Sequence, residues 1–271
     1  PLARSDLSIG IIGAGSMGGA IASGLVEAGA WDVASILVAG HDGHGCAPLA
    51  ERGIRTFDNS ADMLACGPDA VVLAVKPQVL PGVMAECADA LAGKLVVSIA
   101  AGVPISAIEA ALPGARVVRV MPNLCVQVLS GASAVAGGSS ATKEDFDLVV
   151  EIFGALGRAA VMREDQLEVE GAVVGTAPAY FSVFVDTLTR AAVKAGMPSA
   201  AARELLLATM QGCAEQLLAS GEHPRAYAEK VTSPGGTTAC GLYELEPLLF
   251  EGSFAAVNAA LARSAELAAG K

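Results

Sequence analysis

A glycine-rich turn near the start of the chain limits what this sequence can fold into. The run Gly13-Ala14-Gly15-Ser16-Met17-Gly18 follows the apolar segment 8–12 and precedes a helix-compatible stretch. In this context the first glycine permits a tight turn, the second lets a pyrophosphate approach the backbone, and the third lets the helix pack close to the strand. Free N–H groups at the start of the helix favour the anion. The turn therefore predicts dinucleotide binding, and an ordinary glycine-rich strand–helix turn is the alternative.

Short β-branched runs alternate with helix-compatible runs over the first part of the chain. The runs expected to be strands are apolar almost throughout, as strands covered on both faces must be; they are 8–12, 35–39, 70–75, 95–99 and 116–120, with weaker candidates at 132–136 and 158–162. The expected helices between them are 16–28, 46–52, 78–91, 104–112 and 142–156. This alternation predicts an α/β domain of the Rossmann type over residues 1–163, with a doubly wound parallel sheet and right-handed crossovers.

The pattern changes after residue 163, where convincing strands disappear. Pro198-Ser199 and Ser220-Gly221 are turn and cap signals between helical runs. The runs expected to be helices are 177–195, 199–219, 224–230 and 252–269. We therefore expect an all-helical dimerisation and substrate domain over residues 164–271.

Charge and hydropathy exclude several classes of partner. The net charge is −11 and no Lys/Arg cluster is present, which argues against nucleic acid and anionic membranes. The longest uncharged stretch, 120–142, is interrupted by Pro122 and Asn123, so no membrane-spanning segment and no membrane partner are expected. The first residues lack the apolar run of a signal peptide. Hydrophobic residues make up 53% of the chain, and a subunit interface would account for much of that excess.

Cysteine and histidine usage predicts a cytoplasmic protein without a metal. The six cysteines are scattered and form no C-x-x-C pair, so they are expected to be small buried residues in a reducing compartment. His41 and His44 have a spacing seen in metal sites, but they lie among glycines with no further ligand nearby. A loop is the better interpretation of this segment.

The end of the second expected strand bears on the choice of coenzyme. An NAD-specific site usually has Asp or Glu there to hold the ribose diol. This strand instead ends Ala39-Gly40-His41-Asp42, with no carboxylate at the expected position and no adjacent Arg. His41 could face a 2′-phosphate and Asp42 a diol, so the residues leave both coenzymes open. NADP(H) is the favoured coenzyme and NAD(H) the alternative.

Several further strips are more specific than the glycine turn. They are Ala74-Val75-Lys76-Pro77-Gln78, Ala100-Ala101-Gly102, Met121-Pro122-Asn123, Val231-Thr232-Ser233-Pro234-Gly235-Gly236-Thr237-Thr238 and Arg263-Ser264-Ala265-Glu266-Leu267. Together with the glycine turn they closely resemble the pyrroline-5-carboxylate reductase family. The resemblance spans almost the whole chain, and A-V-K-P-Q and V-T-S-P-G-G-T-T are its most specific parts.

This resemblance implies reduction of the cyclic imine Δ1-pyrroline-5-carboxylate to L-proline by NAD(P)H, the last step of proline biosynthesis. It also implies a homodimer whose C-terminal helices interlock, often assembled into a larger ring, with active sites shared between two chains. By the same resemblance, Asn59 lies near the adenosine, Ala74 to Pro77 line the coenzyme, and Ala100 to Gly102 lie near the nicotinamide half. A solvated lysine at a strand end is the alternative for Lys76.

The segment from Ser233 to Thr238 suits a substrate carboxylate. Gly235 and Gly236 expose backbone N–H groups, hydroxyls flank them, and the segment opens an expected helix whose N-terminus favours an anion. The expected substrate-binding residues are Ser233, Gly235, Gly236, Thr237, Thr238 and, by resemblance, Glu164. An exposed surface carboxylate is the alternative for Glu164. Thr238 is the expected catalytic residue, closest to the imine nitrogen as a hydrogen-bond partner or proton relay. A helix-capping turn is the alternative.

The chain departs from the family pattern at three places, which raises the chance of altered kinetics or of a related cyclic imine as substrate. Val174-Gly175-Thr176-Ala177 stands where the family has S-G-S-G, Leu124-Cys125 replaces Thr-Pro, and Lys230 replaces an Asn that reaches the partner chain's coenzyme.

Two rival functions remain. A β-hydroxyacid dehydrogenase needs a Lys on the first interdomain helix, and residues 177–190 contain none. A nucleotide-binding paralogue without catalysis is the non-enzymatic alternative, disfavoured because Ser233, Gly235, Gly236 and Thr238 are retained.

Overall fold

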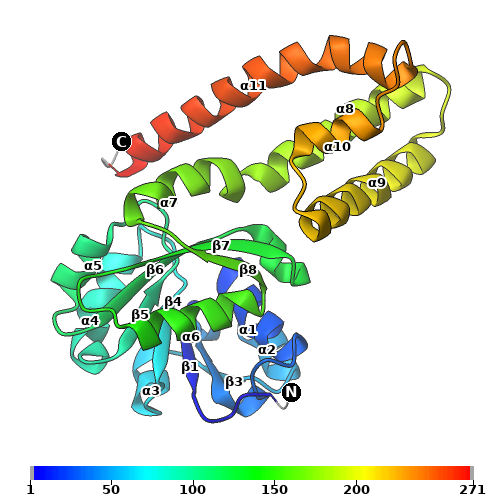
Figure 1. Ribbon diagram of the computed structural model, residues 1–271. Helices are drawn as coiled ribbons and strands as arrows, with labels where there is room; N and C mark the ends of the chain where they lie inside the picture. The colour runs from blue at the N-terminus through cyan, green and yellow to red at the C-terminus, as the bar shows by residue number, and fades with distance from the viewer. Residues whose placement is uncertain (1–2, 269–271) are drawn as a thin grey trace. The chain divides into compact units, whose positions relative to one another are not determined.

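The structure, a computed structural model, describes residues 3–268 of the chain (Figure 1). One sheet organises the first of its two units, in the strand order β3-β2-β1-β4-β5-β6-β7-β8. The strands are β1 (Ile9–Ile12), β2 (Ile36–Ala39), β3 (Arg55–Phe57), β4 (Ala70–Leu73), β5 (Leu95–Ser98), β6 (Arg116–Pro122), β7 (Gly131–Gly137) and β8 (Gly157–Val161).

The first six strands are parallel, but β7 is antiparallel to β6, and β8 pairs parallel to β7. The prediction of a wholly parallel sheet is therefore wrong at its far edge. Only the 3₁₀ helix η3 (Leu124–Val128) lies between β6 and β7, and a parallel return needs a dozen or more residues.

Helices cover both faces of this sheet. They are α1 (Ser16–Glu27), α2 (Ala47–Glu51), α3 (Ser60–Ala65), α4 (Leu80–Leu91), α5 (Ile105–Ala111), α6 (Lys143–Gly154) and α7 (Glu164–Glu170), with 3₁₀ helices η1 (Val33–Ser35) and η2 (His41–Gly43). One apolar cluster joins the sheet to α1, α2 and α6. A second joins it to α3, α4, α5 and α7. Burial on both faces explains why the central strands are apolar throughout.

The expected strands and helices of this unit are confirmed to within a few residues at each end, but one strand and two α-helices were not foreseen. The edge strand β3 has only three residues, among them the exposed Arg55, and gives no apolar pattern. Helix α3 has six residues, and α7 is charged along much of its length. Such short or charged segments carry too little periodicity to be recognised.

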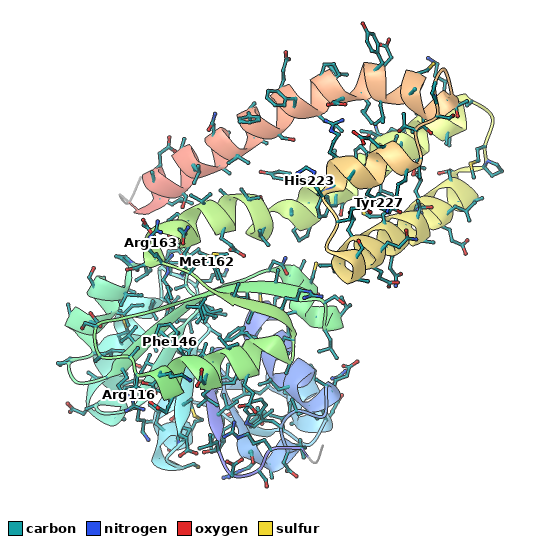
Figure 2. All side chains as sticks on the ribbon, in the orientation of Figure 1. Arg116, Phe146, Met162, Arg163, His223 and Tyr227 are labelled. Carbon is teal, nitrogen blue, oxygen red and sulfur yellow. The ribbon has the colours of Figure 1, made fainter. Side chains whose placement is uncertain are left out.

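A capped helix and an ion pair anchor the antiparallel edge of the sheet. Thr142 and Asp145 form a capping box at the start of α6. Arg116 of β6, labelled in Figure 2, donates from Nε to both carboxylate oxygens of Asp145, at 2.9 and 3.1 Å. Burial alone would raise the pKa of Asp145, but the hydrogen bonds from Arg116 and Thr142 outweigh it and hold that pKa below its usual value. Asp145 thus joins the start of α6 to the first residue of β6.

The second unit, Ala177–Ala260, consists of helices. They are α8 (Ala177–Lys194), α9 (Ser199–Ser220), α10 (Pro224–Lys230) and most of α11 (Thr237–Ala268). The prediction of an all-helical region is confirmed. Helix α11 is far longer than the expected 252–269, because it continues through Pro247, which a sequence pattern treats as a break. The expected end at Ala269 lies outside the described residues.

This helical unit has almost no core of its own. Among its described residues only Val185, Thr189 and Ala202 are buried. Local polar contacts join its helices: the hydroxyl of Tyr227 on α10 donates to Gln216 Oε1 of α9 at 3.0 Å (Tyr227 is labelled in Figure 2). A unit of this kind must bury its apolar side chains against another surface to be stable.

Contacts divide the chain after Thr176 and return residues 261–268 to the first unit. This division differs from the predicted boundary between residues 163 and 164, because α7 packs on the sheet through Leu167. The assignment of substrate binding to residues 164–271 stays a prediction.

One helical run exceeds what the sequence patterns indicated. The π-helical segment η4 (Gly171–Gly175) joins α7 to α8, and the resulting 31-residue run Glu164–Lys194 is long and apolar enough to cross a membrane by length and composition. The expectation that no segment meets this criterion does not hold for this run. A helix that packs its apolar side chains against a protein surface passes the same criterion.

Candidate active site

The glycine turn has the geometry expected of a phosphate-binding turn. Gly13 follows β1 with φ +113°, where its missing side chain avoids the carbonyl oxygen of Ala74. Gly15 is the N-cap of α1, with no side chain capping the helix, and a Cβ placed there would meet nothing within 4 Å. Gly18 is buried and packs against Gly13. The turn thus presents uncapped N–H groups to an open space, as an anion requires.

A groove of about 520 Å³ runs from this turn along α1. Its lining includes Gly15, Ser16, His44 and Arg52, and Gln127 Nε2 lies 3.4 Å from Ser16 Oγ. His44 and Arg52 were missed as candidates. The signal that could have found them is their position on either side of α2, because the loop and helix after the second strand of a dinucleotide-binding sheet lie near the ribose.

The segment after β2 is exposed. His41 is almost fully exposed, and its Nε2 lies 3.6 Å from the carboxylate of Asp42. Strand β2 ends at Ala39 and is followed by Gly40, so no carboxylate stands at the end of this strand. Asn59 caps α3, accepting from the Asp62 N–H at 2.9 Å. The structure therefore gives Asn59 a local role, and its predicted contact with adenosine stays a prediction.

The predicted coenzyme strips follow two neighbouring strands. Ile12, Leu73 and Ser98 are in register at the ends of β1, β4 and β5. The strips from Ala74 to Pro77 and from Ala100 to Gly102 therefore leave the same edge of the sheet as the glycine turn, where ligands bind in open α/β sheets. Lys76 is exposed. A hollow of about 350 Å³ at this edge is lined by Pro77, Gln78, Ala101, Gly102, Val103, Ser264 and Leu267.

The segment Ser233–Thr238 lies in the helical unit, at the start of α11. Gly235 has φ +69°, and the Gly236 N–H donates to the Ser233 carbonyl at 3.0 Å. Helix α11 begins at Thr237, which confirms that the segment opens a helix. Ser233, Gly235 and Thr237 are exposed. This segment and the glycine turn belong to different units, and the predicted contact of Ser233–Thr238 with substrate stays a prediction.

Glu164 makes contacts within the first unit. Its Oε1 accepts from the Ile105 N–H at 2.6 Å, at the start of α5, and lies 3.6 Å from Arg119 Nη1. The N-cap residue of α5 is Pro104, which has no side-chain oxygen, so Glu164 supplies the missing cap. The structure thus gives Glu164 a structural partner, and its contact with substrate stays a prediction.

The residues that depart from the family pattern have local partners. The Thr176 hydroxyl donates to the Ala172 carbonyl at 2.7 Å, and Asn123 Nδ2 donates to the Val174 carbonyl at 3.4 Å, beside the π-helical segment. Lys230 Nζ donates to Glu222 at 2.6 Å. Cys125 donates its N–H to Asn123 Oδ1 at 3.2 Å. The bonds at Thr176, Val174 and Cys125 involve backbone atoms, whereas the bond of Lys230 joins two side chains. The effect of each departure on substrate range stays open to test.

Comparison with protein families matches two parts of the chain. Residues 164–267 match the family described as pyrroline-5-carboxylate reductase dimerisation. Residues 8–102 match the family described as NADP oxidoreductase, coenzyme F420-dependent. The first match covers α7 to α10 and nearly all of α11. The second covers the glycine turn and both predicted coenzyme strips.

Comparison with individual proteins extends over nearly the full length. The chain is 38% identical to the pyrroline-5-carboxylate reductase of Methanosarcina acetivorans, over 96% of this chain and 97% of that one. A solved pyrroline-5-carboxylate reductase from Coxiella burnetii is 33% identical with a TM-score of 0.91, over 97% and 99% of the two chains. The Plasmodium falciparum pyrroline carboxylate reductase, solved with NADP bound, is 28% identical with a TM-score of 0.85, over 96% and 97%. The chain therefore belongs to the pyrroline-5-carboxylate reductase family.

Proposed function

We propose that the protein reduces 1-pyrroline-5-carboxylate to L-proline with a reduced nicotinamide coenzyme. The observation that carries the proposal is similarity to reductases of this substrate over 96% of the chain. Retention of the segment from Ser233 to Thr238 at the start of α11 supports it, because a decayed paralogue would not need these exposed donors.

The residues of the first unit fit a dinucleotide. The uncapped start of α1 and the open space at Gly15 suit a pyrophosphate. NADP(H) is the favoured coenzyme, because no carboxylate ends β2 and because His41, His44 and Arg52 lie in or beside the following segment. The NADP-bound relative from Plasmodium falciparum supports the same choice. When bound, the coenzyme supplies a hydride to the imine carbon.

The chain's own residues would orient the substrate and relay a proton at its imine nitrogen. The backbone N–H of Gly235 and the hydroxyls of Ser233 and Thr237 would hold the substrate carboxylate. The Gly236 N–H is bonded to the Ser233 carbonyl, so Gly236 would shape the turn that presents them. Thr238 would hold the imine nitrogen by a hydrogen bond and relay its proton. A pyrroline nitrogen can arrive protonated, so no strong acid is needed and positioning carries most of the catalysis.

A hydroxyacid dehydrogenase is disfavoured by the structure of α8. Such enzymes use a lysine on this helix to move the hydroxyl proton. The only lysine of α8 is Lys194, its final residue.

The active protein is proposed to be a homodimer formed by the helical unit, with further assembly into a ring. The match to a dimerisation family over residues 164–267 supports this. So does the near absence of buried side chains in that unit. A dimer would also bring one chain's Ser233–Thr238 segment to its partner's coenzyme. We place the enzyme in the cytoplasm, where its six free cysteines would stay reduced.

Substitution of Thr238 tests the substrate half of this proposal. Thr238→Ala should lower kcat about tenfold or more while the Kd for NADPH stays within about twofold of the wild-type value, because the hydroxyl acts on the imine. Thr209→Ala, an exposed threonine on α9, is the matched control. A large loss of NADPH affinity in Thr238→Ala would contradict the placement of this residue on the substrate side.

A further inference from the structure

A polar network links the last helix to the loop after β5. Its centre is Arg119 of β6, whose side chain is 3% exposed. Arg119 Nη2 donates to Glu168 Oε1 of α7 at 2.6 Å, and the Ser264 hydroxyl of α11 donates to Glu168 Oε2 at 2.7 Å. All of these residues belong to the first unit.

The other arm of the network ends at a backbone N–H. Arg119 Nη1 lies 3.6 Å from Glu164 Oε1, and that same oxygen accepts from the Ile105 N–H at 2.6 Å. Ile105 is the first residue of α5 and closes the short loop that begins at Ala100. Ser264, Glu168, Arg119 and Glu164 therefore form a continuous chain of contacts that ends at this loop.

The charged groups of the network compensate one another. A buried guanidinium is costly unless carboxylates compensate it. Arg119 has two, and its Nε has no partner among the described residues. Burial alone would raise the pKa of Glu168, but hydrogen bonds from Arg119 and Ser264 outweigh it and hold that pKa below the usual value. Ser264 and Arg119 hold opposite oxygens of the Glu168 carboxylate, whose side chain is 38% exposed. Loss of the Ser264 hydroxyl would free this carboxylate to rotate toward solvent and away from Arg119.

Two hollows place this network beside the predicted nicotinamide strip. Gly102 and Ser264 line the hollow of about 350 Å³ described above. They also line a second hollow of about 560 Å³, together with Arg119, Glu164 and Glu168. The end of α11 and the loop after β5 thus form walls of the same two spaces.

We propose that Ser264 and Glu168 are positioning residues for hydride transfer: through Arg119 and Glu164 they fix the loop from Ala100 to Ile105 against the nicotinamide half of the coenzyme. The last helix of the chain thereby sets the geometry of the coenzyme site without contacting the reacting atoms. The placement of nicotinamide at this loop rests on the proposed function.

Hydrogen exchange in the coenzyme-free protein tests the network directly. Ser264→Ala should increase amide exchange about tenfold in peptides that contain Ile105 and the preceding loop. Ser264→Thr keeps the hydroxyl and should restore slow exchange. Ser253→Ala, an exposed serine on the same helix, is the matched control. An exchange rate at Ile105 that is unchanged from wild type in Ser264→Ala would overturn the proposal. This outcome does not depend on which substrate the enzyme reduces.

Coenzyme experiments test the functional part. With 1-pyrroline-5-carboxylate, Ser264→Ala and Glu168→Gln should lower kcat about tenfold, since misplacing a reacting group by a fraction of an ångström is costly. The primary isotope effect with NADPH deuterated at the transferred position should rise in both variants and return to the wild-type value in Ser264→Thr. Wild-type kcat and isotope effect in both variants would overturn the positioning role.

The two proposals fail in distinguishable ways. If the wild-type protein does not turn over 1-pyrroline-5-carboxylate, the proposed substrate is wrong, but the binary complex with NADPH still tests the network. In that complex, fluorescence of the bound nicotinamide should differ between wild type and Ser264→Ala while Kd changes by less than about threefold. Identical fluorescence would overturn the positioning of nicotinamide by this network.

Discussion

A Cβ atom on Gly18 would lie 1.9 Å from the carbonyl oxygen of Gly13. The first turn of α1 is therefore packed directly against the residue that follows β1, and only glycine allows the approach. The middle glycine of the same motif differs, because a Cβ on Gly15 would enter open space. Two glycines of one motif thus have separable roles, one in packing and one in access for a ligand.

Alanine substitutions should separate these two roles. Gly18→Ala forces backbone atoms apart and should destabilise the protein by about 1–3 kcal/mol. Gly15→Ala should leave the melting temperature within about 2 °C of wild type and weaken NADPH binding about tenfold or more, because the methyl group occupies the approach of the pyrophosphate. Thermal unfolding and coenzyme titration measure both. Wild-type NADPH affinity in Gly15→Ala would contradict the assignment of this turn to the coenzyme.

Glu170 should make stability fall as pH rises. This residue, at the end of α7, is buried, its Oε2 has no partner among the described residues, and burial raises its pKa from 4.5 to about 7. Between these values the folded protein holds a proton that the unfolded chain has lost. Stability should therefore decline across that window, by on the order of 3 kcal/mol in total, with the loss complete above pH 7.

Glu170→Gln should remove this part of the pH dependence. The variant should match wild type near pH 4 and be more stable than wild type at pH 8, as measured by urea unfolding at fixed protein concentration. Glu144→Gln, an exposed glutamate on α6, is the matched control. Parallel stability curves for Glu170→Gln and wild type from pH 4 to pH 8 would show that Glu170 is not a buried neutral acid.

The helical unit should be a dimer interface. Phe250 and Phe254 of α11 are in contact, with tilted rings whose centroids lie 4.7 Å apart, yet they are 65% and 61% exposed. Phe254→Glu should shift the protein toward monomers in sedimentation velocity and abolish most activity, because each proposed site needs two chains. Val128→Glu changes a comparably exposed residue of the first unit and should leave the assembly intact. A Phe254→Glu protein that sediments as wild type would place the interface elsewhere.

Much of the nucleotide unit could be predicted from sequence, because its signals are local. The apolar runs of β1, β4 and β5 and the glycine turn are recognisable without knowledge of distant residues. The reversal at β7 was missed, although the connection between β6 and β7 is shorter than the dozen or more residues that a parallel return needs. Helix α11 was underestimated because Pro247 gives a strong local signal for a break, and the structure continues through it.

The parts of the candidate site that consist of a local sequence motif could be predicted. The parts that depend on contacts between distant residues could not. The segment from Ser233 to Thr238 stands out by its composition. In contrast, the role of Glu164 as a cap for α5 depends on a residue 59 positions away in the sequence. The bond between Ser264 and Glu168 joins residues 96 positions apart. Neither pairing leaves a pattern in a single sequence, although glutamates at positions 164 and 168 share a helix face.

The most direct test of the proposed function is the oxidation of NADPH by the purified protein in the presence of 1-pyrroline-5-carboxylate, measured as the loss of NADPH absorbance. Piperideine-carboxylate and 3-hydroxy acids, each with the appropriate coenzyme form, are the comparison substrates. We expect turnover of the five-membered imine with L-proline as product, slower turnover of the six-membered imine and none of the hydroxy acids. Absence of turnover with 1-pyrroline-5-carboxylate, by a protein that binds NADPH, would contradict the proposed function.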